Sequence, residues 1–364
     1  MLFKCFEIES MMNRAGTERV PFLFGLDFEM ENGFFIENPM LQSEILFEVN
    51  GIGNYNYNQF LPKESEAIEQ NNNLLFRKTD VDNQNSAIIS KFLSKASEIN
   101  YQGNNYKFEI FPEEYLQYKK RFDIVMDGLK RGNSYLTNLT VKTPIHITMS
   151  LKDIFVSSLS SYKLYIPNKF VCFSPECFVK ISNGKISTHP MKGTIEADIK
   201  DAEQIILNDD KEKAEHNTIV DLLRNDLSRV AKNVVVKRFR YIDKIKSNRG
   251  NLLQISSEIE GNLGDAYLDE IGTIIFKLLP TGSVSGAPKN ATLDIIRNAE
   301  QQARGYYTGV AGYFDGNSFN SFVLIRFIEQ ENDKLYFRSG GGITAMSNAE
   351  KEYHEMLQKV YLPF

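Results

Sequence analysis

Apolar residues recur at helical spacing in four stretches of the chain after about residue 113. The first stretch ends at Arg131-Gly132-Asn133, and its apolar face is formed by Tyr118, Phe122, Val125 and Leu129. The same periodicity predicts three further helices, over residues 211–231, 291–302 and 348–360. The last helix begins with Ser347-Asn348-Ala349-Glu350, which is typical of a capping box.

Between these helices the pattern is that of hairpins. Asn183-Gly184 is the strongest two-residue turn signal, and strand-like runs lie on both sides of it. Asp315-Gly316 marks a second turn, which an apolar run over 319–327 follows. In the N-terminal part, Pro21 to Leu26 is strand-like, and the Asn-rich stretches at 54–58 and 70–73 indicate loops. Hairpins in runs with helices irregularly interspersed predict an α+β fold with antiparallel sheets.

Composition narrows the class of protein. The 364 residues are 42% hydrophobic and 24% charged, as expected of a globular protein that buries a substantial core. No run of 18 or more apolar residues occurs and the first residues lack a cleavable leader, so we expect a cytoplasmic protein without a membrane span. A net charge of −5 argues against nucleic acid as a partner, whereas an anionic small substrate needs only local positive charge.

The cysteines do not indicate a redox or metal function. Cys5, Cys172 and Cys177 cannot all pair within one chain, and their number suits reduced thiols. The C-x4-C spacing of the last two is weak evidence for a metal, and none has the sequence setting of a nucleophile. We expect all three cysteines to be structural.

The Asn183-Gly184 hairpin brings a carboxylate and an amine towards each other. A two-residue turn pairs 182 with 185, and this register places Glu176 opposite Met191, one residue from Lys192. Pro190 weakens the ladder there, so the register is approximate. The two side chains could form a surface ion pair or a catalytic pair, and spacing alone favours the ion pair.

Two pairs of carboxylates lie at i, i+3 on predicted helices. They are Glu212 with Glu215 and Glu352 with Glu355, and Lys359 follows on the same face as the second pair. Oxygen ligands shared between two helices suit Mg²⁺, which binds through few carboxylates and keeps waters. Such pairs are more often solvated helix faces, so spacing alone leaves both interpretations open.

Two glycine-rich segments could admit a ligand close to the main chain. Residues 280–289 lead into a predicted helix, whose N-terminus and hydroxyl groups can receive a carboxylate. The segment is not a P-loop, because its Lys289 follows proline and no Ser or Thr comes next. Ser339 to Ile343 contains three consecutive glycines, which could let a ligand approach the main chain closely or could simply form a turn.

Together these residues form an ordered series of motifs that resembles the chorismate-binding enzyme family. The motifs in chain order are Ser174-Pro175-Glu176, Pro190-Met191-Lys192-Gly193-Thr194, Lys211-Glu212-x-x-Glu215-His216, Asp221-Leu222-Leu223-Arg224-Asn225-Asp226-Leu227, Gly282-Ser283-x-Ser285-Gly286-Ala287-Pro288-Lys289, Arg304-Gly305-x-Tyr307-x-Gly309, Ile325-Arg326, Gly340-Gly341-Gly342-Ile343 and Glu352-x-x-Glu355. The resemblance covers about 113–361. The family includes anthranilate synthase component I, aminodeoxychorismate synthase component I, isochorismate synthase and salicylate synthase.

The resemblance implies a fold of two antiparallel sheets packed face to face, with helices outside and the site between the sheets. A loosely matching N-terminal segment (1–112) and a catalytic region (113–364) would form one structural unit. Glu215 and Glu355 would hold Mg²⁺ directly, and Glu212 and Glu352 would hold its waters. The metal would bind the ring carboxylate of chorismate. The other substrate-binding residues implied are Thr194, Gln254, Ser283, Tyr307, Arg326, Gly341, Gly342 and Lys359.

Lys192 distinguishes among members of the family. Anthranilate and isochorismate synthases usually have alanine at this position, whereas aminodeoxychorismate synthases have lysine, which attacks ring C2 as the C4 hydroxyl leaves. Ammonia then adds at C4 and expels the lysine, and Glu176 serves as acid and base. Leu136 stands where isochorismate and salicylate synthases have a lysine base. The resemblance therefore favours aminodeoxychorismate synthase component I, an amino-transferring enzyme of p-aminobenzoate synthesis.

The sequence departs from the family at Gln254, where a histidine is frequent. An amide can hydrogen-bond but cannot transfer a proton near neutral pH, which speaks against the pyruvate-eliminating chemistry of anthranilate synthase. No amidotransferase signature occurs, so we expect ammonia from a separate glutamine amidotransferase subunit. The alternatives are anthranilate synthase component I and a non-catalytic subunit that binds chorismate or a partner.

Overall fold

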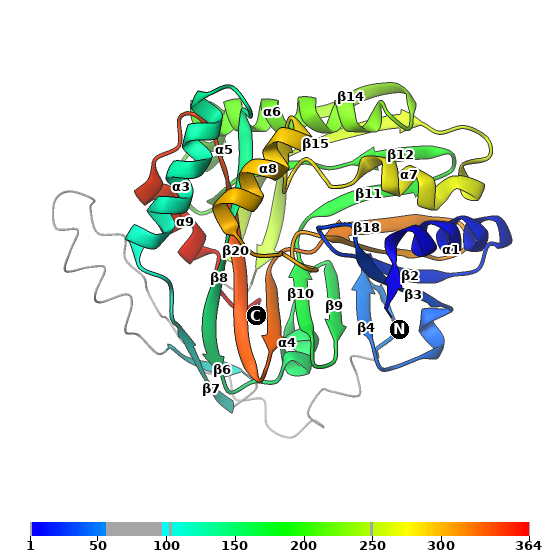
Figure 1. The fold of residues 1–364 in the computed structure, drawn as a ribbon, viewed down its shortest axis with the longest axis horizontal. Coiled ribbons are helices and arrows are strands. Elements are labelled where there is room, and N and C mark those ends of the chain that lie inside the picture. The colour runs from blue at the N-terminus through cyan, green and yellow to red at the C-terminus, as the bar shows by residue number, and fades with distance from the viewer. Residues whose placement is uncertain (1, 56–96, 102–103, 248–249, 364) are drawn as a thin grey trace.

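The computed structural model describes residues 2–55, 97–101, 104–247 and 250–363 (Figure 1). The predicted loop at 70–73 lies outside the described residues, and the one at 54–58 is described only as far as Tyr55. Two sheets of ten strands each form the centre of the molecule, and all their strand pairs are antiparallel. Helices lie outside them, so the predicted α+β fold is confirmed (Figure 1).

The first sheet draws its strands from both ends of the chain. Its order is β1 (Phe3–Lys4), β3 (Asn32–Glu37), β2 (Phe22–Leu26), β17 (Val310–Phe314), β18 (Phe319–Val323), β11 (Cys177–Ser182), β12 (Lys185–Thr188), β15 (Gly250–Asn262) and β13 (Met191–Glu196). The long strand β14 (Lys232–Ser247) also pairs with β15.

The second sheet likewise joins segments that are far apart in sequence. Its order is β5 (Ile52–Gly53), β4 (Leu46–Val49), β9 (Tyr162–Ile166), β10 (Phe170–Ser174), β19 (Phe327–Glu331), β20 (Lys334–Ile343), β8 (Leu136–Ile147), β7 (Asn104–Ile110) and β6 (Ser97–Tyr101). The short strand β16 (Gly286–Ala287) pairs with the beginning of β8.

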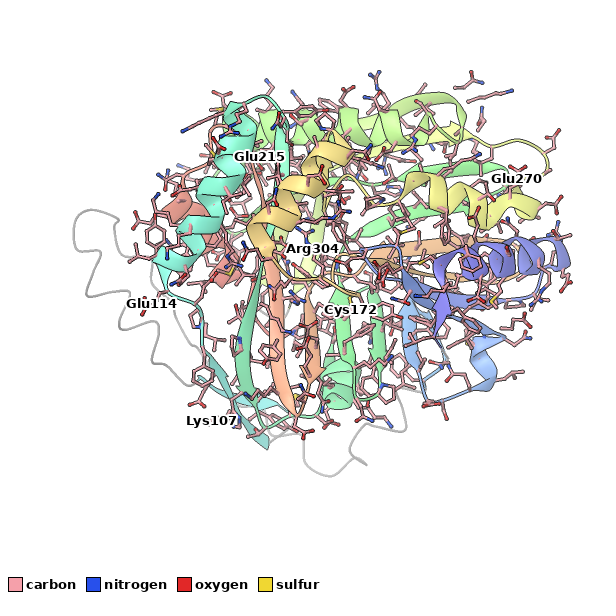
Figure 2. All side chains as sticks on the ribbon, in the orientation of Figure 1. Lys107, Glu114, Cys172, Glu215, Glu270 and Arg304 are labelled. Carbon is pink, nitrogen blue, oxygen red and sulfur yellow. The ribbon has the colours of Figure 1, made fainter. Side chains whose placement is uncertain are left out.

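Strand β2 explains how the two sheets share a core. All five of its residues are buried, because both faces of the first sheet are covered. Phe22 and Phe24 point to a cluster with helices α1 (Cys5–Glu18), α6 (Asp210–Leu227) and α7 (Ile271–Leu278). Leu23 points the other way, into a cluster with Phe47, Phe170 and other residues of the second sheet. The sheets therefore pack face to face there, and Cys172, labelled in Figure 2, belongs to this shared core.

Four further helices cover other surfaces of the sheets. They are α3 (Tyr115–Lys130), α8 (Lys289–Glu300) and α9 (Ala349–Gln358), which pack beside β8 and β20, and α4 (Leu151–Ser157), which packs on β9 and β10. A short helix, α5 (Ala202–Asn208), contacts β13 and β15. No helix among the described residues is long and apolar enough to cross a membrane.

The sequence predicts most local elements, with two corrections. Asn183-Gly184 forms the expected turn, and Ser182 pairs with Lys185 in the predicted register. The apolar run over 319–327 is divided between two strands, because the chain leaves the first sheet after Val323 and enters the second at Phe327. The four predicted helices exist, although the helix predicted over 211–231 ends at Leu227.

The second correction concerns the start of α9. The N-cap is Asn348 rather than Ser347, and the Asn348 side chain accepts hydrogen bonds from the backbone N–H groups of Glu350 and Lys351. The Ser347 hydroxyl instead donates to Glu352 at 2.8 Å. The three cysteines are unpaired and buried, as expected.

Candidate functional site

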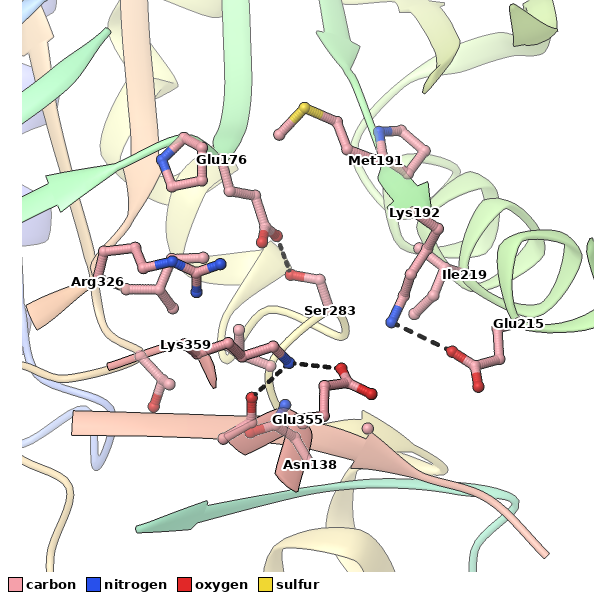
Figure 3. A pocket seen from close by; sticks show the side chains of 18 of the residues that line it. Asn138, Glu176, Met191, Lys192, Glu215, Ile219, Ser283, Arg326, Glu355 and Lys359 are labelled. Carbon is pink, nitrogen blue, oxygen red and sulfur yellow. Dashed lines mark hydrogen bonds and ion pairs between the residues drawn. The ribbon is translucent and has the colours of Figure 1, made fainter. Parts of the chain in front are cut away.

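A cavity of about 500 Å³ opens where the two sheets, α6 and α9 meet (Figure 3). Residues from nearly every predicted motif line it. The predicted site residues in its wall are Glu176, Lys192, Glu212, Glu215, Gln254, Ser283, Tyr307, Arg326, Gly341, Gly342, Glu355 and Lys359. Motifs that are spread over more than 180 residues of sequence therefore line one cavity, which is large enough for a small metabolite.

Two predicted residues are not among the described residues that line the cavity. The side chain of Thr194 lies outside the described part of the chain, and its backbone pairs with Gln254 between β13 and β15. Glu352 is buried, and its carboxylate lies beside Gly341 of the cavity wall, where a Cβ atom added to the glycine would be 3.7 Å from Glu352 Oε2.

Glu176 and Arg326 lie where two adjacent strands pass from one sheet to the other. Glu176 follows β10 of the second sheet and directly precedes β11 of the first, while Arg326 lies between β18 and β19. The N–H of Val323 donates to the Glu176 carbonyl at 3.1 Å, and the N–H of Phe173 donates to the Arg326 carbonyl at 3.0 Å. We call this crossing the sheet corner. Its backbone hydrogen bonds fix the main-chain positions from which the Glu176 and Arg326 side chains extend.

The backbone of Arg326 is strained at this corner. Its φ is +52°, a left-handed conformation that a residue with a long side chain rarely adopts. Strained residues persist where the surroundings hold them, and they concentrate at functional sites. The Arg326 Nε donates to the Tyr361 hydroxyl at 3.2 Å, and the guanidinium lies over the ring of Tyr361. The cation is thus held in one orientation within the cavity.

The Glu176 carboxyl is poised to hold a proton. Burial raises its pKa, against the opposing effects of the Ser283 hydrogen bond and of the cations Lys192 and Arg326. Ser283 Oγ donates to Glu176 Oε1 at 2.6 Å. A carboxyl whose pKa is raised in a cavity can act as a proton donor as well as an acceptor.

The ladder expected between Glu176 and Lys192 was wrong. Strand β12 ends at Thr188, and β13 pairs with β15 instead of continuing along β11. The register shifts at Gly193, whose φ is +73°, and such a bulge redirects the neighbouring side chain. As Figure 3 shows, Lys192 enters the cavity from the opposite wall, with its Nζ 3.6 Å from Glu215 Oε2.

Acidic side chains from two helices face each other across the lower part of the cavity. Burial raises the pKa of Glu212, and the nearby charges of Glu215 and, more weakly, Glu355 raise it further, while Lys192 opposes them. Glu355 accepts from the Lys359 ammonium at 2.9 Å. In the described parts of the chain no three such groups lie close enough together to form a metal site.

Lys359 is the third cation of the cavity. Its ammonium also donates to the Gly340 carbonyl at 2.9 Å, beside the glycines of β20. Burial lowers its pKa, and the adjacent Glu355 carboxylate opposes this effect. Together with Arg326 and Lys192, this side chain gives a protein of negative net charge a local positive surface suited to an anion.

Comparison with known proteins identifies the family to which these motifs belong. Residues 4–363, nearly the whole chain, match the family described as chorismate binding enzyme. The chain belongs to the chorismate-binding enzyme family. It is therefore an enzyme that uses chorismate, and the expectation from its motifs is confirmed at this level.

Relatives of this chorismate-binding enzyme carry more than one name. An uncharacterized PabA-like protein of Pasteurella multocida is 44% identical over 354 residues, which cover 96% of each chain. Aminodeoxychorismate synthase component 1 of Bacillus subtilis is 32% identical over 63% of this chain and 51% of its own. Anthranilate synthase component 1 of Aquifex aeolicus is 36% identical over 52% of this chain and 39% of its own. These names leave the product of the enzyme open.

Solved structures share the fold. The crystal structure of anthranilate synthase component I from Streptococcus pneumoniae superposes with a TM-score of 0.59 at 24% identity, over 75% of this chain and 63% of that one.

Sequence reasoning assigned no role to three groups that lie in or beside the site of the chorismate-binding enzyme. Asn138 and Tyr361 line the cavity, and each lies two residues from a position that the motifs did identify, Leu136 and Lys359. The buried His216 ring bonds Ser257 Oγ at 2.7 Å, which joins α6 to β15. Strand alternation could have placed Asn138 beside Leu136, but the other contacts depend on long-range packing.

Proposed function

We propose that this enzyme is the synthase component that converts chorismate and ammonia to 4-amino-4-deoxychorismate, an aminodeoxychorismate synthase component I. The observation that carries this proposal is Lys192, whose amine enters the cavity from β13. A lysine is a nucleophile that the alanine of the related motif cannot provide. Glu176, the proton-holding carboxyl, lies across the same cavity (Figure 3).

In the proposed reaction the neutral Lys192 amine attacks ring C2. Both ring double bonds shift by one position, the C4–O bond breaks, and the hydroxyl leaves as water with a proton from Glu176. The resulting carboxylate takes back a proton from the Lys192 nitrogen, which is now bonded to C2. Ammonia then bonds to C4 while both double bonds return to their first positions, the C2–N bond breaks, and Glu176 protonates the departing Lys192 nitrogen. Loss of one proton from the new amine restores the Glu176 acid. The raised pKa of Glu176 supports both of its roles.

The proposal includes a Mg²⁺ ion, for which the acidic side chains would have to move closer together than the structure places them, since Glu215 and Glu355 each lie beside a lysine. Glu215 and Glu355 would be direct ligands, and Glu212 and Glu352 would hold its waters. The mutual effect of the carboxylates on the pKa of Glu212 supports a role for a hard cation there. Bound Mg²⁺ would supply charge that neutralises the ring carboxylate of chorismate.

The second carboxylate of chorismate, on its enolpyruvyl group, would meet the remaining cations. Arg326 and Tyr307 lie in the cavity wall with the backbone of Gly341 and Gly342, and Lys359 lies beside them. A guanidinium held by Tyr361 suits a carboxylate. Ser283, Gln254 and Thr194 are further substrate contacts in the proposal.

Ammonia would come from a separate glutamine amidotransferase subunit, and ammonium would replace it in the assay. Purified protein is incubated with chorismate, Mg²⁺ and ammonium, and products and pyruvate are followed by mass. Aminodeoxychorismate without pyruvate is the expected result. Lys192→Ala should abolish it, whereas Lys185→Ala, on an exposed lysine of the neighbouring hairpin, should leave it unchanged. Intact mass with chorismate alone should reveal the Lys192 adduct.

Anthranilate synthase is the second candidate, because a relative of that name is 36% identical over half of this chain. Its reaction releases pyruvate, so anthranilate with an equal amount of pyruvate would replace our proposal by this one. Gln254 lies in the cavity wall where a proton-transferring residue would be needed, which favours the first candidate.

A further inference from the structure

Residues 279–288, which we call the serine segment, connect α7 to α8 and carry Ser283 into the cavity wall. The Ser283 hydroxyl donates to Glu176 Oε1 at 2.6 Å, as the dashed line in Figure 3 shows. This hydrogen bond stabilises the ionised carboxyl, and it opposes the rise that burial causes in the pKa of Glu176. The position of Ser283 therefore affects how firmly Glu176 holds its proton.

A largely buried ion pair joins the end of the serine segment to α6. Lys289 Nζ lies 3.0 Å from Asp226 Oδ1, and the two side chains are 17% and 12% exposed. Both residues belong to the ordered motifs, but neither is among the described residues that line the cavity. Any effect of this pair on the reaction must therefore pass through other residues.

Lys289 also ties the two ends of the serine segment to each other. It is the first residue of α8, and its ammonium donates at 2.9 Å to the carbonyl of Leu278, the last residue of α7. Burial lowers the pKa of Lys289, and the adjacent Asp226 carboxylate opposes this effect and so favours the charged ammonium. One charged group thus fixes where the segment begins and where it ends.

Asp226 contacts the serine segment at Gly282, the residue before Ser283. Burial raises the pKa of the Asp226 carboxyl, and Lys289 and a hydrogen bond from the Gly282 backbone are among the effects that oppose this rise. A Cβ atom at Gly282 would lie 3.2 Å from Asp226 Oδ2 and only 2.6 Å from Leu222 Cδ2, so α6 packs on this glycine more closely than a side chain would permit.

Ser283 is the contact through which the serine segment acts on Glu176. The other groups that shift the pKa of this carboxyl, besides its burial, are the cations Lys192, Arg326 and Lys359, and all three lie on other elements of the fold. A displacement of the segment would therefore weaken the Ser283 hydrogen bond while these cations remain in place.

We propose that Asp226 and Lys289 are positioning residues, which hold the serine segment so that the Ser283 hydroxyl stays hydrogen-bonded to Glu176. The pair lines no part of the cavity and acts on the chemistry only through Ser283. Its consequence for the reaction rests on the proposed function, in which Glu176 transfers protons. Its consequence for the proton affinity of Glu176 does not.

The test is Asp226→Leu combined with Lys289→Met, which removes both charges and leaves neither one buried without its partner. Infrared spectroscopy follows the protonation of Glu176 through the carboxyl band that Glu176→Gln removes, and chorismate consumption is measured over the same pH range. We expect the midpoint pH of the band to rise by about one pH unit, as in Ser283→Ala, because a hydrogen bond to a charged group is lost. The decrease of rate at high pH should move with the midpoint.

The paired change should shift the midpoint no further when it is added to Ser283→Ala, because two changes that act through one hydroxyl are not additive. Lys142→Met is the matched control, since Lys142 is 16% exposed, pairs with Glu329 at 3.0 Å and is not among the described residues of the cavity wall. It should leave the midpoint unchanged.

Three outcomes would overturn the proposal: an unshifted midpoint in the paired variant, a shift that adds in full to that of Ser283→Ala, or an equal shift in the control. Thermal unfolding shows whether each variant is folded. If the paired variant is not, Lys289→Met alone decides by the same criteria. The product formed by the unaltered protein tests the proposed function separately, since the infrared titration needs no turnover.

Discussion

Replacing Arg304 by methionine should destabilise the enzyme and distort the cavity together. Arg304 is 1% exposed, and its guanidinium donates to Glu300, Thr308 and the carbonyls of Val284 and Asn138. Figure 2 shows Arg304 beside α8 and the strands of the second sheet. All of these partners except Glu300 line the cavity, so a single buried cation holds three parts of its wall.

The magnitude follows from the burial of the pair. Arg304 Nη2 lies 2.6 Å from Glu300 Oε1, and both side chains are essentially inaccessible to solvent. Removing one partner of a buried, hydrogen-bonded ion pair costs ~3–5 kcal/mol, because the other charge stays buried. With an unfolding entropy of ~2.1 cal/mol/K per residue, a protein of 364 residues should lose about 4–7 °C in its unfolding temperature.

Scanning calorimetry at a fixed scan rate measures this shift, and chorismate consumption measures the effect on the cavity. Arg297→Met is the matched control, because Arg297 lies on the neighbouring helix, is 73% exposed and pairs only at the surface with Asp294. It should change stability by less than about 0.5 kcal/mol. The reasoning is refuted if Arg304→Met unfolds within 1 °C of the unaltered protein, or if the control loses as much.

Three further changes test the chemistry of the cavity. Burial raises the pKa of Glu176, so a reaction that needs the protonated carboxyl should slow as pH rises through that pKa. Glu176→Gln should lower kcat by about 10²–10⁴ and remove this decrease of rate at high pH. If the variant keeps the decrease, another group causes it. Lys192→Met removes the ammonium beside Glu215, so calorimetry should detect Mg²⁺ binding up to about fivefold tighter, and weaker binding would contradict the proposed ligand. Gln254→His should introduce pyruvate release, while unchanged products would make this position incidental.

Local signals predicted local structure well. The Asn183-Gly184 turn, with positive φ at both residues, fixed the register of β11 and β12 because a two-residue turn permits few alternatives. Amphipathic periodicity located the helices, although it could not identify Asn348 as the N-cap. The ordered motifs predicted that the site residues lie together, and the structure places most of them around one cavity.

Contacts between distant segments could not be predicted from the sequence. The apolar run over 319–327 fits one strand, and only the pairing of β18 with β11 and of β19 with β10 shows that it crosses between sheets. A second long-range pairing explains why Lys192 faces Glu215 rather than Glu176, since strand β13 pairs within the first sheet with β15, about 60 residues later in the chain. The register of a hairpin does not determine which distant strand pairs with which, because that pairing depends on packing over both faces of a sheet.

The sheet corner has a mechanical consequence. Because β10–β11 and β18–β19 cross between the sheets side by side and are joined there by backbone hydrogen bonds, Glu176 and Arg326 are tied to both sheets. Lys192 lies on the first sheet alone, and Lys359 contacts the glycines of the second. A displacement of one sheet relative to the other would therefore change the distance between the two lysines more than the distance between Glu176 and Arg326. A ligand that contacts both lysines would oppose such a displacement, whereas a ligand bound only at the sheet corner would not.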